Sequence, residues 1–148
     1  MPASVTGLEI EVIAHATEDL DKVIKAIEAV IPPCARGKIK LKSKELRGHH
    51  GNPIRLVKAR VRDRSIADAV FKHVISSLPD EDKAELIWNL KKRLSGGSLY
   101  IRLDKQRAFL GQLKLCSSDP IRLKVKFSSS RLSDVREACE EAGLRFEP

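Results

Sequence analysis

The sequence predicts a single domain, residues 1–148, with an α+β fold: a mostly antiparallel sheet of about six strands with helices packed on one face. Three observations predict this. Several segments alternate apolar with polar residues, as strands do, whereas others repeat apolar residues at the spacing of a helix. In several strand segments, Lys or Arg fills one set of alternating positions and aliphatic residues fill the other. Such a sheet can leave one side in water, so helices need to cover only the other.

The first predicted element is a strand over residues 7–16, where apolar residues occupy every second position. Thr17 is the expected N-cap of a helix over residues 18–31, because acidic side chains follow it in the first turn. Apolar residues recur along this helix every three or four positions, and Pro32-Pro33 ends it.

A basic hairpin is predicted next. Residues 37–46 and residues 54–63 each alternate cations with aliphatic residues, which is typical of strands with one wet face. The cations on that face are Lys38, Lys40, Lys42 and Lys44 in the first strand, and Lys58, Arg60 and Arg62 in the second.

Two helices are expected after the hairpin, over residues 66–78 with Ser65 as the N-cap, and over residues 79–94, ended by Gly96-Gly97. The remaining strands are expected over residues 98–104, 106–116 and 120–128. Ser130 or Ser133 is the expected cap of a closing helix over residues 132–143.

The net charge of +8 is distributed unevenly along the chain. The first 31 residues are acidic overall, whereas residues 36–64 are crowded with Lys and Arg and hold only Glu45 and Asp63 against them. Cations on exposed strands are common because they discourage aggregation at sheet edges. However, like charges on neighbouring strands destabilise a sheet, whereas a face that binds phosphates has reason to keep them. The charge distribution therefore favours a polyanion as partner.

The segment "RGHHGNP", residues 47–53, is expected to form an irregular connection at the tip of the basic hairpin, because its glycines and Asn52-Pro53 favour a turn. Four interpretations of His49 and His50 stay open. They could contact RNA, serve only as residues of the turn, act in proton transfer, or bind a metal. A metal would need further ligands, such as Cys34, His15 or His73, for which the spacing gives no signal.

Other chemically capable residues favour structural roles. His15 and His73 are expected to be hydrogen-bonded packing residues, and Trp88 is expected in the core. Tyr100 shares a strand face with Arg102, so base stacking stays open for it. The three cysteines lie outside any CxxC pattern, which favours free thiols in a reducing compartment. No apolar run is long enough to span a membrane, and the N-terminus lacks the features of a signal peptide.

The runs "KELRGHHGNPI" and "SLYIRLDKQRAFLG" resemble a family of small archaeal RNA-binding proteins named predicted exosome subunits. The likeness covers nearly the whole chain, and its most specific parts are the "GHHGNP" loop and the "LYIRLDKQ" strand. The fold of that family is similar to the ribosomal protein that binds 5S RNA, an α+β sandwich with an open sheet. The resemblance implies RNA binding and a link to RNA processing or ribosome biogenesis. The resemblance implies no catalytic residue. The positions that match the motifs of the family are Lys44, Arg47, His49, His50, Asn52, Arg102, Asp104 and Gln106.

Together these observations predict a non-catalytic, cytoplasmic RNA-binding protein without metal or cofactor, which contacts RNA through a basic sheet face and the Gly-His-His-Gly loop. The expected partners are RNA and an exosome or ribosome-biogenesis complex, with no membrane, and the sequence is compatible with a homodimer. The predicted RNA-binding residues are Lys38, Lys40, Lys42, Lys44, Arg47, His49, His50, Asn52, Arg55, Lys58, Arg60, Arg62, Arg102 and Lys124. Two alternatives remain: an RNA hydrolase that uses His49 or His50, and a protein-interaction subunit of a larger complex.

Overall fold

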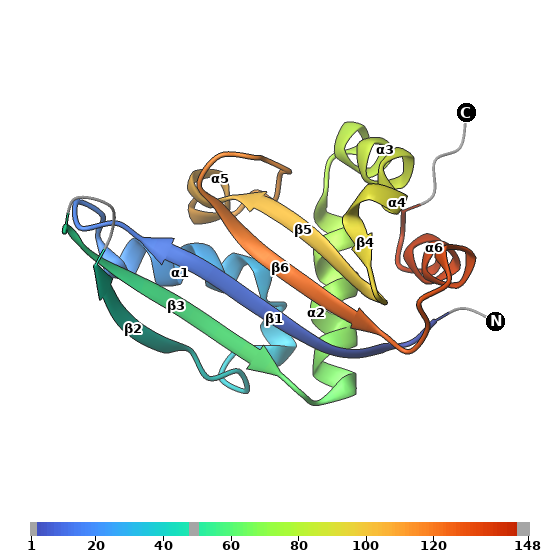
Figure 1. The fold of residues 1–148 in the computed structure, drawn as a ribbon, viewed down its shortest axis with the longest axis horizontal. Helices are drawn as coiled ribbons and strands as arrows, with labels where there is room; N and C mark the ends of the chain where they lie inside the picture. The colour runs from blue at the N-terminus through green and yellow to red at the C-terminus, as the bar shows by residue number, and fades with distance from the viewer. Residues whose placement is uncertain (1–2, 48–50, 145–148) are drawn as a thin grey trace.

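The computed structural model describes residues 3–47 and 51–144, and within them it has the predicted α+β architecture (Figure 1). One six-stranded sheet has the order β2-β3-β1-β6-β5-β4, and every neighbouring pair is antiparallel. The strands are β1 (Val5–Ala14), β2 (Lys42–Arg47), β3 (Pro53–Val61), β4 (Leu94–Ser95), β5 (Ser98–Asp104) and β6 (Pro120–Phe127).

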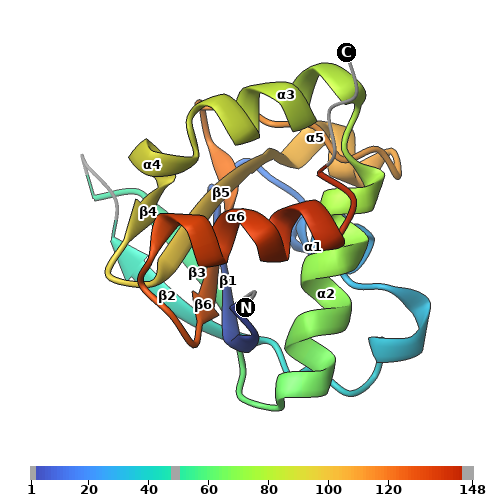
Figure 2. The ribbon, with the colours of Figure 1, turned by 90° about the vertical axis from the view of Figure 1, so that its right-hand side faces the viewer.

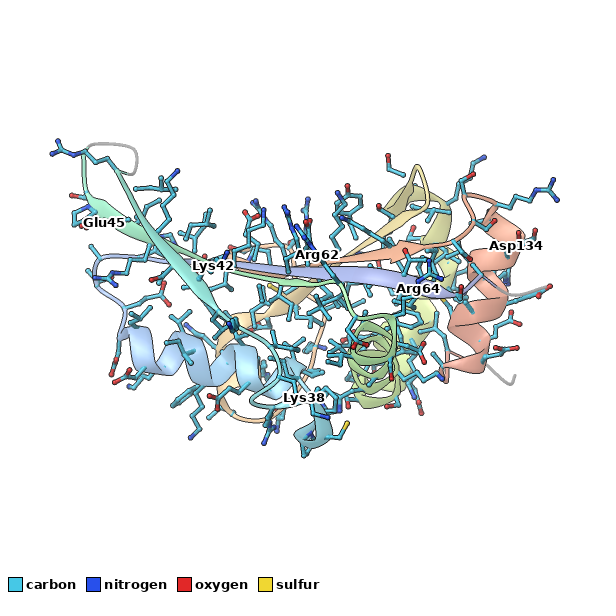
Figure 3. All side chains as sticks on the ribbon, turned by 90° about the horizontal axis from the view of Figure 1, so that it is seen from below. Lys38, Lys42, Glu45, Arg62, Arg64 and Asp134 are labelled. Carbon is cyan, nitrogen blue, oxygen red and sulfur yellow. The ribbon has the colours of Figure 1, made fainter. Side chains whose placement is uncertain are left out.

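The long helices α1 (Leu20–Val30) and α2 (Arg64–Ser77) lie against one face of the sheet, and the opposite face carries no helix in the described part of the chain (Figures 1 and 3). Helix α6 (Leu132–Glu141) lies at the end of the sheet near the chain termini, beside α2 (Figure 2). The shorter helices are α3 (Asp80–Trp88), α4 (Leu90–Arg93) and α5 (Lys105–Phe109), and a 3-10 turn spans Pro33–Ala35. None of the helices in the described ranges has the length and apolar composition needed to cross a bilayer.

The core fills the space between the covered face of the sheet and the helices. Ile10, Leu123 and Ile101 lie side by side across β1, β6 and β5, and each is at most 1% exposed. From the helix side, Phe71 packs edge-to-face on Phe127 with ring centroids 5.4 Å apart. Because side chains alternate along a strand, this burial fixes which residues of the same strands face solvent.

The strand predicted over residues 106–116 is wrong. Asp104 ends β5 and its carboxylate accepts a hydrogen bond from the Arg107 amide, which starts helix α5 instead. The rest of the segment is irregular and pairs with β5 through an isolated bridge between Leu103 and Leu115. The sixth strand is the two-residue β4.

The first strand of the hairpin is also shorter than predicted. It begins at Lys42, because Gly37 takes a left-handed φ of 86° within a turn that follows the 3-10 helix. Lys38 and Lys40 therefore precede the strand. The sequence pattern alternates through this region, but the backbone does not continue as a strand.

Several helix boundaries and capping residues differ from the predicted ones. Asp19 caps α1 in place of Thr17, and Asp63 caps α2 in place of Ser65. The helix predicted over residues 79–94 is interrupted at Asn89, whose side chain donates to the Glu85 carbonyl oxygen. At α6, neither Ser130 nor Ser133 caps the helix; the Ser129 hydroxyl accepts from the Arg131 amide.

The interruption at Asn89 also explains why the prediction for Trp88 is wrong. Leu86 and Leu90 take the buried positions on either side, at 0% and 2% exposure, and leave Trp88 82% exposed. His73 is satisfied as predicted, since its Nε2 lies 3.0 Å from the Ala29 carbonyl oxygen. His15 is exposed and pairs with Asp119, so it is not a packing residue.

We predict that Leu123→Ala lowers the free energy of unfolding by about 2–5 kcal/mol, because it opens a cavity at the centre of the core. Leu110→Ala is the matched control, since Leu110 is 68% exposed and its truncation should change stability by less than about 0.5 kcal/mol. Urea denaturation of both variants measures the difference. Equal losses in the two variants would contradict this placement of the core.

Candidate nucleic-acid interface

The uncovered face of the sheet, called here the open face, brings together basic residues from strands far apart in sequence. Across neighbouring strands, Lys42 lies opposite Lys58, which lies opposite Glu11. On the other side of β1, Glu11 lies opposite Arg122, which lies opposite Arg102. The next row runs from Arg60 through Glu9 and Lys124 to Tyr100. Most cations of β2, β3, β5 and β6 therefore do lie on one common face.

These cations form two clusters on either side of β1. The hairpin cluster lies on β2, on β3 and in the segments next to them, and consists of Lys40, Lys42, Lys44, Lys58, Arg60 and Arg62. Lys38, which was predicted on the same face, lies on the helix side of the sheet (Figure 3) and lines only the adjacent groove. The β5–β6 cluster consists of Arg102, Arg122, Lys124 and Lys126. Figure 3 views the sheet along its edge and shows Arg62 on the side away from α1 and α2.

The central strand β1 places Glu9 and Glu11 between the two clusters, so this face also carries carboxylates. Arg60 Nε donates to Glu9 Oε1 at 3.0 Å, and Lys126 Nζ lies 3.7 Å from the same oxygen. On the neighbouring row, Arg122 lies 4.0 Å from Glu11. The inner cations are thereby partly compensated. Within the described residues, Lys42, Lys44 and Arg62 have no carboxylate at ion-pair distance.

The nearby cations lower the pKa of the Glu9 carboxyl. Burial raises the pKa of this carboxyl, but the nearby charges of Lys126, Lys58, Lys124 and Arg60 outweigh burial, and the pKa lies below its usual value. Glu9 is therefore ionised at neutral pH. Its side chain is 15% exposed, so it interacts mainly with neighbouring cations of the open face.

A groove of about 650 Å³ lies beside the hairpin cluster, at the junction of residues 38–42, the end of β3 and the start of α2. The cations that line it are Lys38, Lys40, Lys42, Lys58, Arg60 and Arg62. Among the described residues that line the groove, the one carboxylate is that of Asp63, which accepts a hydrogen bond from the Ile66 amide at 3.1 Å and so caps α2. The groove forms because residues 38–41 do not pair with β3 as a strand. The alternating sequence pattern of these residues did not predict this.

The other predicted contact residues lie at three different places. Arg102 and Lys124 lie on the open face, where the Lys124 ammonium sits 5.8 Å from the centroid of the Tyr100 ring. Arg47 and Arg55 are exposed, but the register puts them on the opposite side of the hairpin from Lys42 and Lys58.

Asn52 is exposed at the start of β3, next to Gly51, which has a φ of 76°. His49 and His50 lie outside the described residues.

A second group of polar residues, which the sequence analysis missed, lies at the end of β1. Lys105 is 6% exposed, and its Nζ donates to Glu18 Oε1 at 2.8 Å and to the Ile13 carbonyl oxygen at 2.9 Å. Asp119 Oδ2 is 2.9 Å from the same nitrogen, and Asp119 Oδ1 is 3.0 Å from His15 Nε2. Residues so distant in sequence give no spacing signal.

This group joins β1, α1, α5 and the entry to β6. His15, Glu18 and Asp119 could each offer a ligand atom to a metal ion, with those atoms within 4.8 Å of one another. However, the Lys105 ammonium already lies between the two carboxylates. The geometry is that of an internal ion pair that fixes the end of the sheet.

We predict that this ion pair makes stability fall in acid. Burial raises the pKa of Asp119, but the hydrogen bonds and charges of Lys105 and His15 outweigh it and hold the pKa below the usual value of 3.8. The contribution is therefore complete above about pH 4 and is lost as the pH falls through the lower, folded-state pKa. Urea denaturation from pH 2.5 to 7 should show wild type more stable than Asp119→Asn near neutrality.

The same series should show that difference shrinking below about pH 4, where the carboxyl of wild type becomes protonated. Glu18→Gln serves as a comparison, because it removes the other carboxylate bound to Lys105. A difference that stays constant across the whole range would show that Asp119 does not act through its charge.

Comparisons with known proteins agree with these features. A family model described as RNA binding matches residues 7–127. An uncharacterized protein of Methanocaldococcus jannaschii is 37% identical over 118 residues, which is 78% of each chain. A Pyrococcus abyssi protein named as an RNA-binding protein is 30% identical over 140 residues, 91% of each chain. The crystal structure of a DUF54 protein from Archaeoglobus fulgidus superimposes with a TM-score of 0.78 at 26% identity, covering 94% of this chain and 99% of the other.

Proposed function

Because the chain belongs to this RNA-binding family, we propose that it binds RNA through the open face and the adjacent groove, without catalysing a reaction on the RNA. The observation that carries the proposal is the meeting of basic residues from β2, β3, β5 and β6 on one face that no described helix covers. Support also comes from the relative named as an RNA-binding protein.

The chemistry of the face suits phosphate. Lys and Arg side chains neutralise phosphates and release the counterions condensed on RNA, which supplies binding energy independent of sequence. The groove concentrates six such side chains around a concave volume, and its one carboxylate is engaged in capping a helix. A backbone segment of RNA lying in the groove would meet cations from both of its walls.

The position of this activity in the cell is a further part of the proposal. The resemblance to proteins named predicted exosome subunits, and to the ribosomal protein that binds 5S RNA, favours a cytoplasmic role in RNA processing or ribosome biogenesis. The protein would bind RNA through the open face and so bring it to a larger complex.

We predict that the protein does not cleave RNA. Labelled RNA incubated with the purified protein, with and without divalent metal, should remain intact. Cleavage that is abolished in a His49→Ala/His50→Ala variant would contradict this prediction.

We predict that RNA affinity depends strongly on salt. If about five to seven phosphates are neutralised, the logarithm of the association constant should fall with log[salt] at a slope of roughly −3.5 to −6. Fluorescence anisotropy with labelled RNA at 50–300 mM KCl measures the slope. A slope near zero would leave the electrostatic basis of the proposal without support.

We also predict that the groove cations contribute more to RNA affinity than exposed cations elsewhere. A variant that loses four of them should bind RNA at least tenfold more weakly at about 100 mM salt, because several phosphate contacts are lost. This variant combines Lys38→Gln, Lys40→Gln, Lys42→Gln and Arg62→Gln. The control variant removes the same number of positive charges from exposed residues of α2, α4 and α6. It combines Lys72→Gln, Lys91→Gln, Lys92→Gln and Arg136→Gln.

The control variant should retain affinity within about threefold of wild type, the remaining effect being that of net charge. Both variants should unfold at the same urea concentration as wild type within error, since all eight positions are exposed. Equal loss of affinity in the two variants would mean that the proposed face is not the binding site.

A further inference from the structure

We propose that the RNA bound by the open face is base-paired, and that its minor groove faces strand β1. This inference rests on the proposed function and adds to it the class of RNA and the orientation in which the RNA lies. Three features of the open face carry it: its scarcity of aromatic rings, its two separate clusters of cations, and the carboxylates between them.

The open face is poorly equipped to hold unpaired bases. Proteins that bind single strands stack successive bases on exposed aromatic side chains. In the described part of the chain, the open face offers one aromatic residue, Tyr100, and the Lys124 ammonium already lies over its ring. Phe71 and Phe127 are buried in the core, and the exposed Trp88 belongs to α3 in the helix layer.

The two cation clusters suit two phosphate strands. Neighbouring strands of a sheet lie about 4.8 Å apart, so β3 and β6 are separated by roughly 10 Å, and β2 and β5 by roughly 19 Å. The hairpin cluster and the β5–β6 cluster therefore form two lines of cations with β1 between them. A single RNA strand can follow one line, whereas the two backbones that border the shallow minor groove of an A-form duplex can occupy both.

The carboxylates of β1 define what can lie between those backbones. Glu9 and Glu11 repel phosphate, so an RNA backbone is not expected to run along β1. The minor groove of duplex RNA, by contrast, presents 2′-hydroxyl groups, which can donate hydrogen bonds to a carboxylate. Glu9 is held by Arg60 at 3.0 Å, but Glu11 is 33% exposed and its Arg122 partner is 4.0 Å away, so Glu11 is the available acceptor.

The test compares one sequence of about 20 nucleotides in three forms: duplex RNA, duplex DNA and single-stranded RNA, each titrated with the full-length protein at about 100 mM salt. We expect duplex RNA to bind at least tenfold more tightly than either of the others. Single-stranded RNA that binds as tightly as duplex RNA would overturn the inference and leave the proposed function standing. Absence of binding to all three would overturn both.

Two substitutions test the orientation. Glu11→Ala should lower the ratio of duplex RNA to duplex DNA affinity at least threefold, because the acceptor for the 2′-hydroxyl is lost and the repulsion of DNA phosphates is weakened. Glu11→Gln, which keeps the shape of the side chain, should lower the ratio less. Tyr100→Leu should leave duplex RNA affinity within about twofold of wild type.

An unchanged ratio in Glu11→Ala, or a loss of affinity in Tyr100→Leu, would overturn the proposed orientation. Circular dichroism and urea denaturation of each variant show whether the fold is retained. The affinity ratio is the decisive quantity, because a general loss of stability changes both affinities together.

Discussion

The carboxylates of Glu9 and Glu11 allow two strongly basic strands to flank the same central strand of the sheet. In β3 and β6, cations alternate with aliphatic residues, and burial of the aliphatic residues places five of these cations on the same side: Lys58, Arg60, Arg122, Lys124 and Lys126. Without a compensating strand between them, their side chains would lie directly opposite one another and destabilise the sheet. The lowered pKa of Glu9 reflects this compensation, since it is set by the four cations around that carboxyl.

The same arrangement leaves the outer cations available. Glu9 engages Arg60 and Lys126, and Arg122 is the partner of Glu11, whereas the groove and the edges of the face hold cations without a described carboxylate partner. The charge that stabilises the sheet thus lies at its centre, and the charge that can neutralise a ligand lies on both sides of it. This separation is what gives the open face a shape that an RNA can match, beyond a general excess of positive charge.

The sequence predicted the elements in which two signals agree. Strands β1, β3, β5 and β6 combine alternation with one-sided burial, and their predicted ranges lie within a few residues of the observed ones. Residues 106–116 were mistaken for a strand because Leu113 and Leu115 alternate, although the hydrogen bond from the Arg107 amide to the Asp104 carboxylate starts a helix. The position of Trp88 depends on the interruption at Asn89, and the groove depends on the turn at Gly37.

No local sequence pattern predicts the order of the strands. The position of Glu9 and Glu11 between the cations, and the contact of Lys105 with Glu18 and Asp119, depend on that order and could not be predicted either.

The central claim is that RNA lies on the open face with both cation clusters in contact. It is tested most directly by nuclear magnetic resonance, through titration of isotope-labelled protein with a short RNA duplex and mapping of the shifted signals. The account predicts the largest shifts at Lys42, Arg62, Arg102 and Arg122, from both sides of β1, and little change in α3 and α4. Shifts confined to the helices, or to the hairpin alone, would contradict it.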